Sequence, residues 1–79
     1  MKIEVRVFAT LRPYLPELAV GEAKIVAVEP GTTLAEIRDM LGLPADEVKI
    51  IMCNSLQAKL DDVPADGDRI AYIPAVAGG

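Results

Sequence analysis

The sequence contains no histidine and no tryptophan, and it has a single cysteine, Cys53. Without histidine, the chain offers no imidazole ligand for a metal and no base for histidine-assisted nucleophilic catalysis. One cysteine cannot form an internal disulfide or ligate a cluster by itself. The acidic stretch "DDVPADGD" also lacks the spacing of a calcium loop. We therefore expect no metal site, and we expect Cys53 to be a small buried thiol rather than part of a sulfur relay.

The sequence also has no excess of positively charged residues. Eight Lys and Arg residues are scattered singly against twelve Asp and Glu, which gives a formal net charge of −4. Proteins that bind nucleic acid normally show a basic patch or stripe, so no nucleic-acid partner is expected. No apolar run approaches membrane-spanning length and no targeting segment is evident. These features are typical of a cytoplasmic protein without a membrane partner.

The pattern of apolar residues predicts one small domain. Strands are expected over residues 2–9, 22–29, 48–53, 56–60 and 69–74, and one helix over residues 33–44. Pro13 and Pro16 allow at most a short helical turn after the first strand. The strand at 48–53 is expected to be buried on both faces. This order predicts an α+β protein with the β-grasp (ubiquitin-like) fold, in which one main helix packs on one face of a mixed sheet of four to five strands.

The helix has the clearest local signals. Thr33 and Glu36 match a capping box, in which each side chain bonds a free backbone N–H of the other residue. Gly42 suits the C-terminal cap, and Pro44 prevents the helix from continuing. The apolar stripe of this helix is expected to face the core; it consists of Leu34, Ile37, Met40 and Leu41.

Alternation along the first and last strands predicts an exposed patch. If Ile3, Val5 and Val7 face the helix together with Ile70 and Tyr72, then the outer face carries Arg6, Phe8, Arg69, Ala71 and Ile73. Phe8, Ala71 and Ile73 would form an apolar surface edged by arginines. The partner-binding surface is expected to consist of Phe8, Arg12, Arg69, Ala71, Ile73 and Pro74. A protein interface has this composition. The alternative is that single exposed apolar residues are normal and have no function.

The chain ends on Gly78 and Gly79, and residues 1–74 are expected to form the domain while 75–79 form a flexible tail. Five residues follow Pro74, and fully extended they reach at most about 17 Å. Ala75, Ala77 and Gly78 are slim enough for a narrow channel, and Val76 is expected to anchor at its mouth. The alternative is that a Gly-Gly end is simply a disordered terminus or an expression scar.

Three stretches resemble a known family. "VFATLR", "GTTLAEIRDML" and "DGDRIAYIPAVAGG" are similar to the MoaD/ThiS sulfur-carrier family, and most of all to the small subunit of molybdopterin synthase. The chain departs from the family pattern at Asn54-Ser55, where Asn-Gly is common, and at Ile73 and Ala75, where a second aromatic residue or a proline is common. These departures affect the identity of the partner rather than the fold.

The resemblance implies a function at the chain end. An adenylating, E1-like activating enzyme would use ATP to adenylate the carboxylate of Gly79, and sulfur would then replace the adenylate to give a thiocarboxylate. The large subunit of molybdopterin synthase would use this sulfur, in a complex with two copies of each subunit. The chain would bind no cofactor and would not be an enzyme by itself. Arg12 could pair with an acidic group on a partner, or it could be a solvated surface residue.

Two alternatives remain open. The first keeps the chemistry but changes its destination, to thiamine, a tungsten cofactor, tRNA, or lysines of other proteins as a ubiquitin-like modifier. The second is a β-grasp interaction domain with an inert tail.

Overall fold

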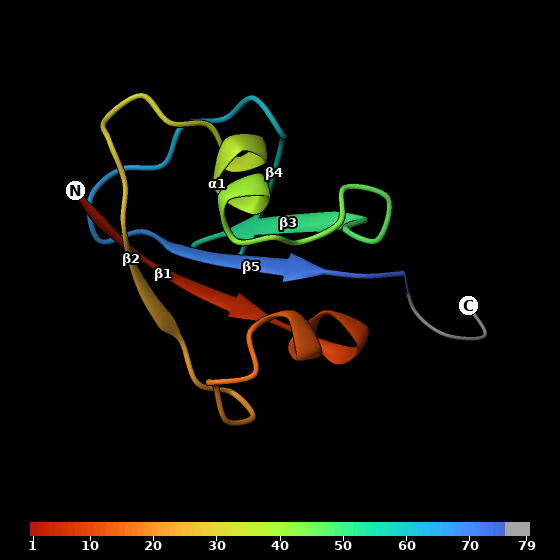
Figure 1. The fold of residues 1–79 in the computed structure, drawn as a ribbon. Helices are drawn as coiled ribbons and strands as arrows, with labels where there is room; N and C mark the ends of the chain where they lie inside the picture. Colours follow the sequence, from red (N-terminus) through yellow and green to blue (C-terminus); the bar gives the residue numbers. More distant parts are fainter. Residues whose placement is uncertain (76–79) are drawn as a thin grey trace.

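The computed structural model describes residues 1–75 and contains five strands, one α-helix and one 3₁₀-helix (Figure 1). The elements follow the chain in the order β1 (Lys2–Val7), η1 (Ala9–Tyr14), β2 (Lys24–Ala27), α1 (Leu34–Met40), β3 (Ile50–Cys53), β4 (Leu56–Ala58) and β5 (Arg69–Ile73). The short helical turn expected around Pro13 is η1. All the strands expected from the sequence are present, and each is shorter than expected at one or both ends.

The strands form one mixed sheet in the order β2-β1-β5-β3-β4. The two central strands, β1 and β5, are parallel, and every other neighbouring pair is antiparallel. Helix α1 lies across one face of this sheet (Figure 1). The predicted β-grasp fold is therefore confirmed, and its first and last strands lie side by side.

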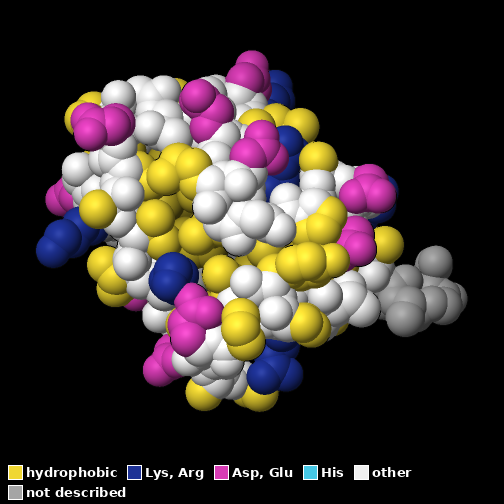
Figure 2. Space-filling model, viewed as in Figure 1, with side chains coloured by type: hydrophobic (Ala, Val, Ile, Leu, Met, Phe, Trp, Pro, Cys, Tyr) yellow, Lys and Arg dark blue, Asp and Glu magenta, His cyan; other side chains and the backbone are white. Residues whose placement is uncertain are grey.

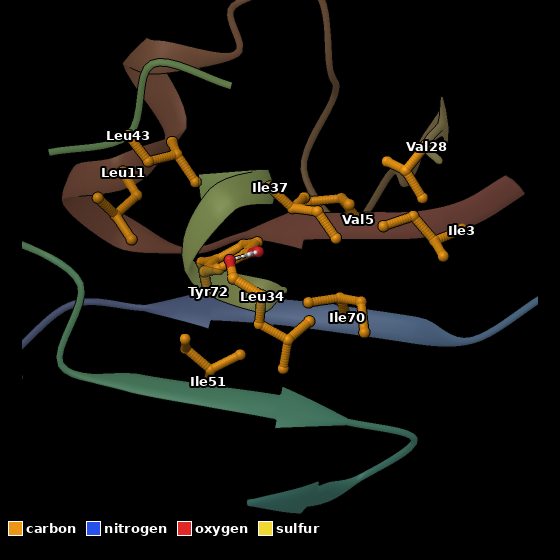
Figure 3. Packing of buried hydrophobic residues seen from close by; sticks show 10 residues of the cluster. All are labelled: Ile3, Val5, Leu11, Val28, Leu34, Ile37, Leu43, Ile51, Ile70 and Tyr72. Atoms are coloured by element: carbon orange, nitrogen blue, oxygen red, sulfur yellow. Dashed lines mark hydrogen bonds between the residues drawn. The ribbon is translucent and has the colours of Figure 1, made fainter. Parts of the chain in front are cut away.

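The core fills the space between α1 and the sheet (Figure 3). Ile3 and Val5 of β1 are fully buried, as are Ile70 and Tyr72 of β5. The Tyr72 hydroxyl donates a hydrogen bond of 2.7 Å to the carbonyl of Leu34, in the first turn of α1. This bond satisfies the one polar group of a fully buried side chain, and it ties the helix to the strand that leads to the chain end.

Helix α1 begins with the predicted capping box. The Thr33 hydroxyl accepts a hydrogen bond from the Glu36 backbone N–H, and the Glu36 carboxylate accepts one from the Thr33 N–H. Gly42 has a φ of +74°, which suits its predicted place after the helix. The helix is shorter than expected and ends at Met40. The expectation that Met40 faces the core is wrong, since its side chain is 61% exposed.

Strand β3 also differs from the prediction that both of its faces are buried. Ile51 is buried beneath α1, whereas Ile50 is 38% exposed. The difference arises because α1 covers only one face of the sheet, so alternate residues of β3 lie on the uncovered face. Figure 2 shows hydrophobic side chains in a broad area of the surface seen in that view, with acidic and basic side chains scattered around it.

Within residues 1–75, no helix has both the length and the apolar character needed to cross a membrane. The same residues contain no group of three or more metal-ligating side chains that could hold an ion.

Candidate partner-binding site

The uncovered face of the sheet contains an open groove of about 320 Å³ along β5. We call it the sheet groove. Its lining is mostly apolar with two arginines, and consists of Arg6, Phe8, Met52, Ser55, Arg69, Ile70, Ala71 and Ile73. Phe8, Ala71 and Ile73, predicted from alternation to share this face, do line one surface. Phe8 is 42% exposed, and Ala71 and Ile73 are half-buried.

Strand register explains why these side chains meet. Arg6 of β1 lies opposite Ala71 of β5, and Ala71 lies opposite Met52 of β3. The next row toward the chain end pairs Ile73 with Ile50. Because residues directly opposite each other point to the same face, three strands contribute to one continuous surface. Met52 and Ser55 were not predicted as members, since β3 was expected to be buried on both faces.

The two arginines of the groove form no ion pair with an acidic side chain of residues 1–75. The Arg6 Nε donates a bond of 3.3 Å to the carbonyl of Gly21. The ion pairs found within residues 1–75 are Lys24 with Glu17 and Arg38 with Asp39, so neither Arg6 nor Arg69 is neutralised by an acid of the described chain.

Two other residues predicted at the partner surface lie elsewhere. Arg12 is exposed on η1, in a separate hollow beside Ala9, Pro13, Pro16 and Leu18. Pro74 is buried by its own chain, which differs from the expectation that it faces a partner. Its position at the end of β5 places it on the same side as Ile70 and Tyr72, which are in the core.

The environment of Cys53 fits a structural thiol. The Cys53 Sγ is half-buried and donates to the Asp68 Oδ2 at 3.5 Å. Burial, followed by the bond to Asp68, raises the pKa of the Cys53 thiol. A thiol held in its protonated form is a poor nucleophile, because the thiolate is the reactive species.

Of the predicted tail, only Ala75 lies within the described residues, and it is exposed directly after β5. The predictions for Val76, Ala77, Gly78 and Gly79 fall outside the described residues. Ala75 lies near the rim of the sheet groove, because two residues that line the groove are the last residue of β5, Ile73, and the residue that directly follows β1, Phe8.

A mixed five-stranded sheet with one helix on one face defines a small ubiquitin-like protein. The chain belongs to the Mut7-C ubiquitin family, whose model matches residues 1–78. No curated protein sequence matches the chain significantly.

Solved structures of small ubiquitin-like proteins are similar over the full length of the chain. SAMP1 from Haloferax volcanii has a TM-score of 0.73 and 24% identity, with 100% of both chains covered. The HVO 2177 protein from the same organism has a TM-score of 0.74 and 27% identity, covering 100% of this chain and 87% of its own. A chain of the complex of subunits 1 and 2 of the molybdopterin-converting factor from Helicobacter pylori 26695 has a TM-score of 0.64 and 24% identity, with 100% of both covered. These matches confirm the ubiquitin-like fold, and they include a chain from a molybdopterin-converting factor, the kind of protein that the sequence resembles.

Proposed function

We propose that the protein is a sulfur carrier, in which the backbone carboxylate of Gly79 is the reactive group and the β-grasp domain presents it to partner enzymes. The observation that carries the proposal is the path of β5. This strand lies at the centre of the sheet and leads straight into the last residues, beside an apolar groove edged by Arg6 and Arg69.

The chemistry requires activation before sulfur can enter. An α-carboxyl group has a pKa of about 3.3–3.7, so at neutral pH it is a carboxylate that can attack the α-phosphate of ATP. This attack forms an acyl-adenylate and releases pyrophosphate. Hydrosulfide then attacks the acyl carbon and AMP leaves, which replaces one oxygen of the carboxylate by sulfur. Neither step needs a side chain from this chain, in agreement with its lack of histidine.

The geometry suits delivery into a partner's active site. Ala75 is exposed, and the residues after Pro74 reach at most about 17 Å when extended. We propose that the activating enzyme and a sulfur-using partner hold the domain through the sheet groove and Arg12, while Ala75, Val76, Ala77 and Gly78 carry Gly79 into their active sites. We further propose the large subunit of molybdopterin synthase as the sulfur-using partner, in a complex with two copies of each subunit.

Intact mass spectrometry tests the carrier function. The purified protein is incubated with ATP, an E1-like activating enzyme from its own organism and sodium sulfide. We expect a mass increase equal to the exchange of one oxygen for one sulfur. Two variants serve as controls, a deletion of Gly79 and a variant with one alanine added after Gly79, and both should stay unchanged. An unchanged mass of the wild-type protein with every activating enzyme of that organism would instead indicate an interaction domain with an inert tail.

A second candidate function is protein modification, because SAMP1, which is similar in fold, is described as a small archaeal modifier protein. In this case a lysine amine of a target protein would attack the acyl-adenylate and AMP would leave. Incubation of the activated protein with a cell extract, followed by peptide mass mapping, separates the two functions. After tryptic digestion a modifier would leave residues 70–79 attached to lysines of other proteins, because Arg69 is the last tryptic site of the chain. A dedicated sulfur carrier would leave no such remnant.

A further inference from the structure

The two arginines of the sheet groove lie on neighbouring strands of the same face. Arg6 is opposite Ala71, and Arg69 lies two residues before Ala71 along β5, opposite Glu4. Their side chains therefore flank one end of the apolar floor that Ala71, Met52 and Ile73 provide.

This local positive charge contrasts with the rest of the molecule. The chain as a whole has a net charge of −4, yet both charged residues that line the groove are arginines, and neither forms an ion pair within residues 1–75. Although Glu4 is the register partner of Arg69, the two side chains are not among those ion pairs. Arg69 is exposed and Arg6 is half-buried. A guanidinium group that has no carboxylate partner in its own chain can bind one from another protein through two parallel hydrogen bonds.

From this charge complementarity we propose that the sheet groove binds a protein segment that presents one large apolar side chain next to one or two carboxylates. The apolar side chain packs on Phe8, Ala71 and Ile73, while the carboxylates pair with Arg6 and Arg69. The groove volume of about 320 Å³ is at the small end of binding pockets, which suits one or two side chains rather than a whole helix. The apolar floor and the net negative charge disfavour a nucleic-acid phosphate backbone.

This inference rests on the proposed function, because it states the chemistry by which the activating enzyme or the sulfur-using partner recognises the domain. It is also separable from it. Sulfur loading of Gly79 can be measured by mass whether or not the groove prefers acidic segments.

A selection experiment tests the preference without knowledge of the partner. A random peptide library displayed on phage is selected on the immobilised protein, and the consensus peptide is synthesised together with a version in which each Asp and Glu is changed to Asn and Gln. Binding of both peptides is measured by ¹⁵N-labelled NMR titration. We expect an apolar-acidic consensus, with shifts at the amides of Ala71 and Ile73, and the neutral version should bind on the order of tenfold more weakly for each lost carboxylate.

Charge reversal separates recognition from a structural role of the arginine. Arg69→Glu should weaken binding of the acidic peptide on the order of a hundredfold, and it should create binding of a peptide in which Lys replaces the acidic residues. Lys59→Glu makes the same change of charge at an exposed residue outside the groove and should leave the acidic peptide bound as before. Arg6→Gln provides a second test. In this variant Arg69 keeps the groove positively charged.

Several outcomes would overturn the inference. A consensus without acidic residues, shifts confined to another face, or the absence of any enriched peptide would each do so. Concentration-dependent shifts at Ala71 and Ile73 without peptide would assign the groove to a second copy of the chain. If sulfur loading stays normal in any of these cases, the carrier function stands and the acidic partner segment is refuted.

Discussion

Within residues 1–75, the bond from Tyr72 to Leu34 is the one side-chain hydrogen bond that is fully buried (Figure 3), and Tyr72→Phe removes it with little change in shape. The substitution leaves the Leu34 carbonyl without this donor in a site that water does not reach. Loss of such a bond costs about 1–2 kcal/mol. In a domain of this size each kcal/mol lowers Tm by about 4–8 °C.

The assay is urea unfolding followed by circular dichroism, with thermal unfolding as a second measurement. Tyr14→Phe is the matched control, because the Tyr14 hydroxyl bonds Glu47 at 3.3 Å on the exposed surface. We expect little change in that variant. If Tyr72→Phe changes the free energy of unfolding by less than about 0.5 kcal/mol, the hydrogen bond does not contribute as argued.

We also expect Tyr72 to make the folded protein less stable at alkaline pH. Burial raises the pKa of Tyr72 above its ordinary value, so the folded state favours the neutral phenol. The associated stabilisation is complete below the unfolded pKa of about 10 and declines above it by up to about 1.4 kcal/mol per pH unit. Tyr72→Phe should make this decline smaller, and the part that remains includes the contribution of Cys53, whose pKa is also raised. An equal decline in both proteins between pH 10 and the onset of unfolding would contradict the assignment to Tyr72.

The remaining predictions concern local structure. Ser55 has a φ of +71° in the turn between β3 and β4, and we expect Ser55→Gly to raise the free energy of unfolding by about 0.5–1 kcal/mol in urea, because only glycine adopts this conformation without strain. Thr33→Ala removes half of the capping box and should lower it by about 1 kcal/mol, whereas equal stability would mean that the box does not hold the helix start. The Asp68 pKa is lowered, first by the Ala65 backbone N–H and then by Asn54, so this stabilisation is present at neutral pH and is lost as pH falls through the lowered pKa. Asp68→Asn should therefore show a weaker loss of stability in acid than the wild-type protein, and an unchanged acid profile would refute the role of Asp68.

The central strands could be predicted well because alternation is a local property. Ile3, Val5, Ile70 and Tyr72 alternate with polar or small residues, and that pattern settles which face is buried. The capping box of Thr33 and Glu36 could be predicted equally well, since it involves only residues that are close in sequence. The outer groove could be anticipated as far as Phe8, Ala71 and Ile73 because both of their strands were assigned correctly.

The errors occurred where burial depends on how far another element extends. Met40 belongs to the apolar stripe of the helix, but the helix ends there and leaves the side chain exposed. Ile50 belongs to an apolar run that suggested burial on both faces, yet nothing in residues 1–75 covers its outer face fully. The burial of Pro74 depends in the same way on side chains packed around the end of β5 and not on its neighbours in sequence.

The most direct test of the carrier function is the intact mass of the protein purified from its own cells under conditions that preserve thiocarboxylates. We predict a chain that ends at Gly79, with a fraction carrying sulfur in place of one terminal oxygen. A native polypeptide that continues beyond Gly79 without being trimmed would contradict the account, because no backbone carboxylate would then be available at that residue.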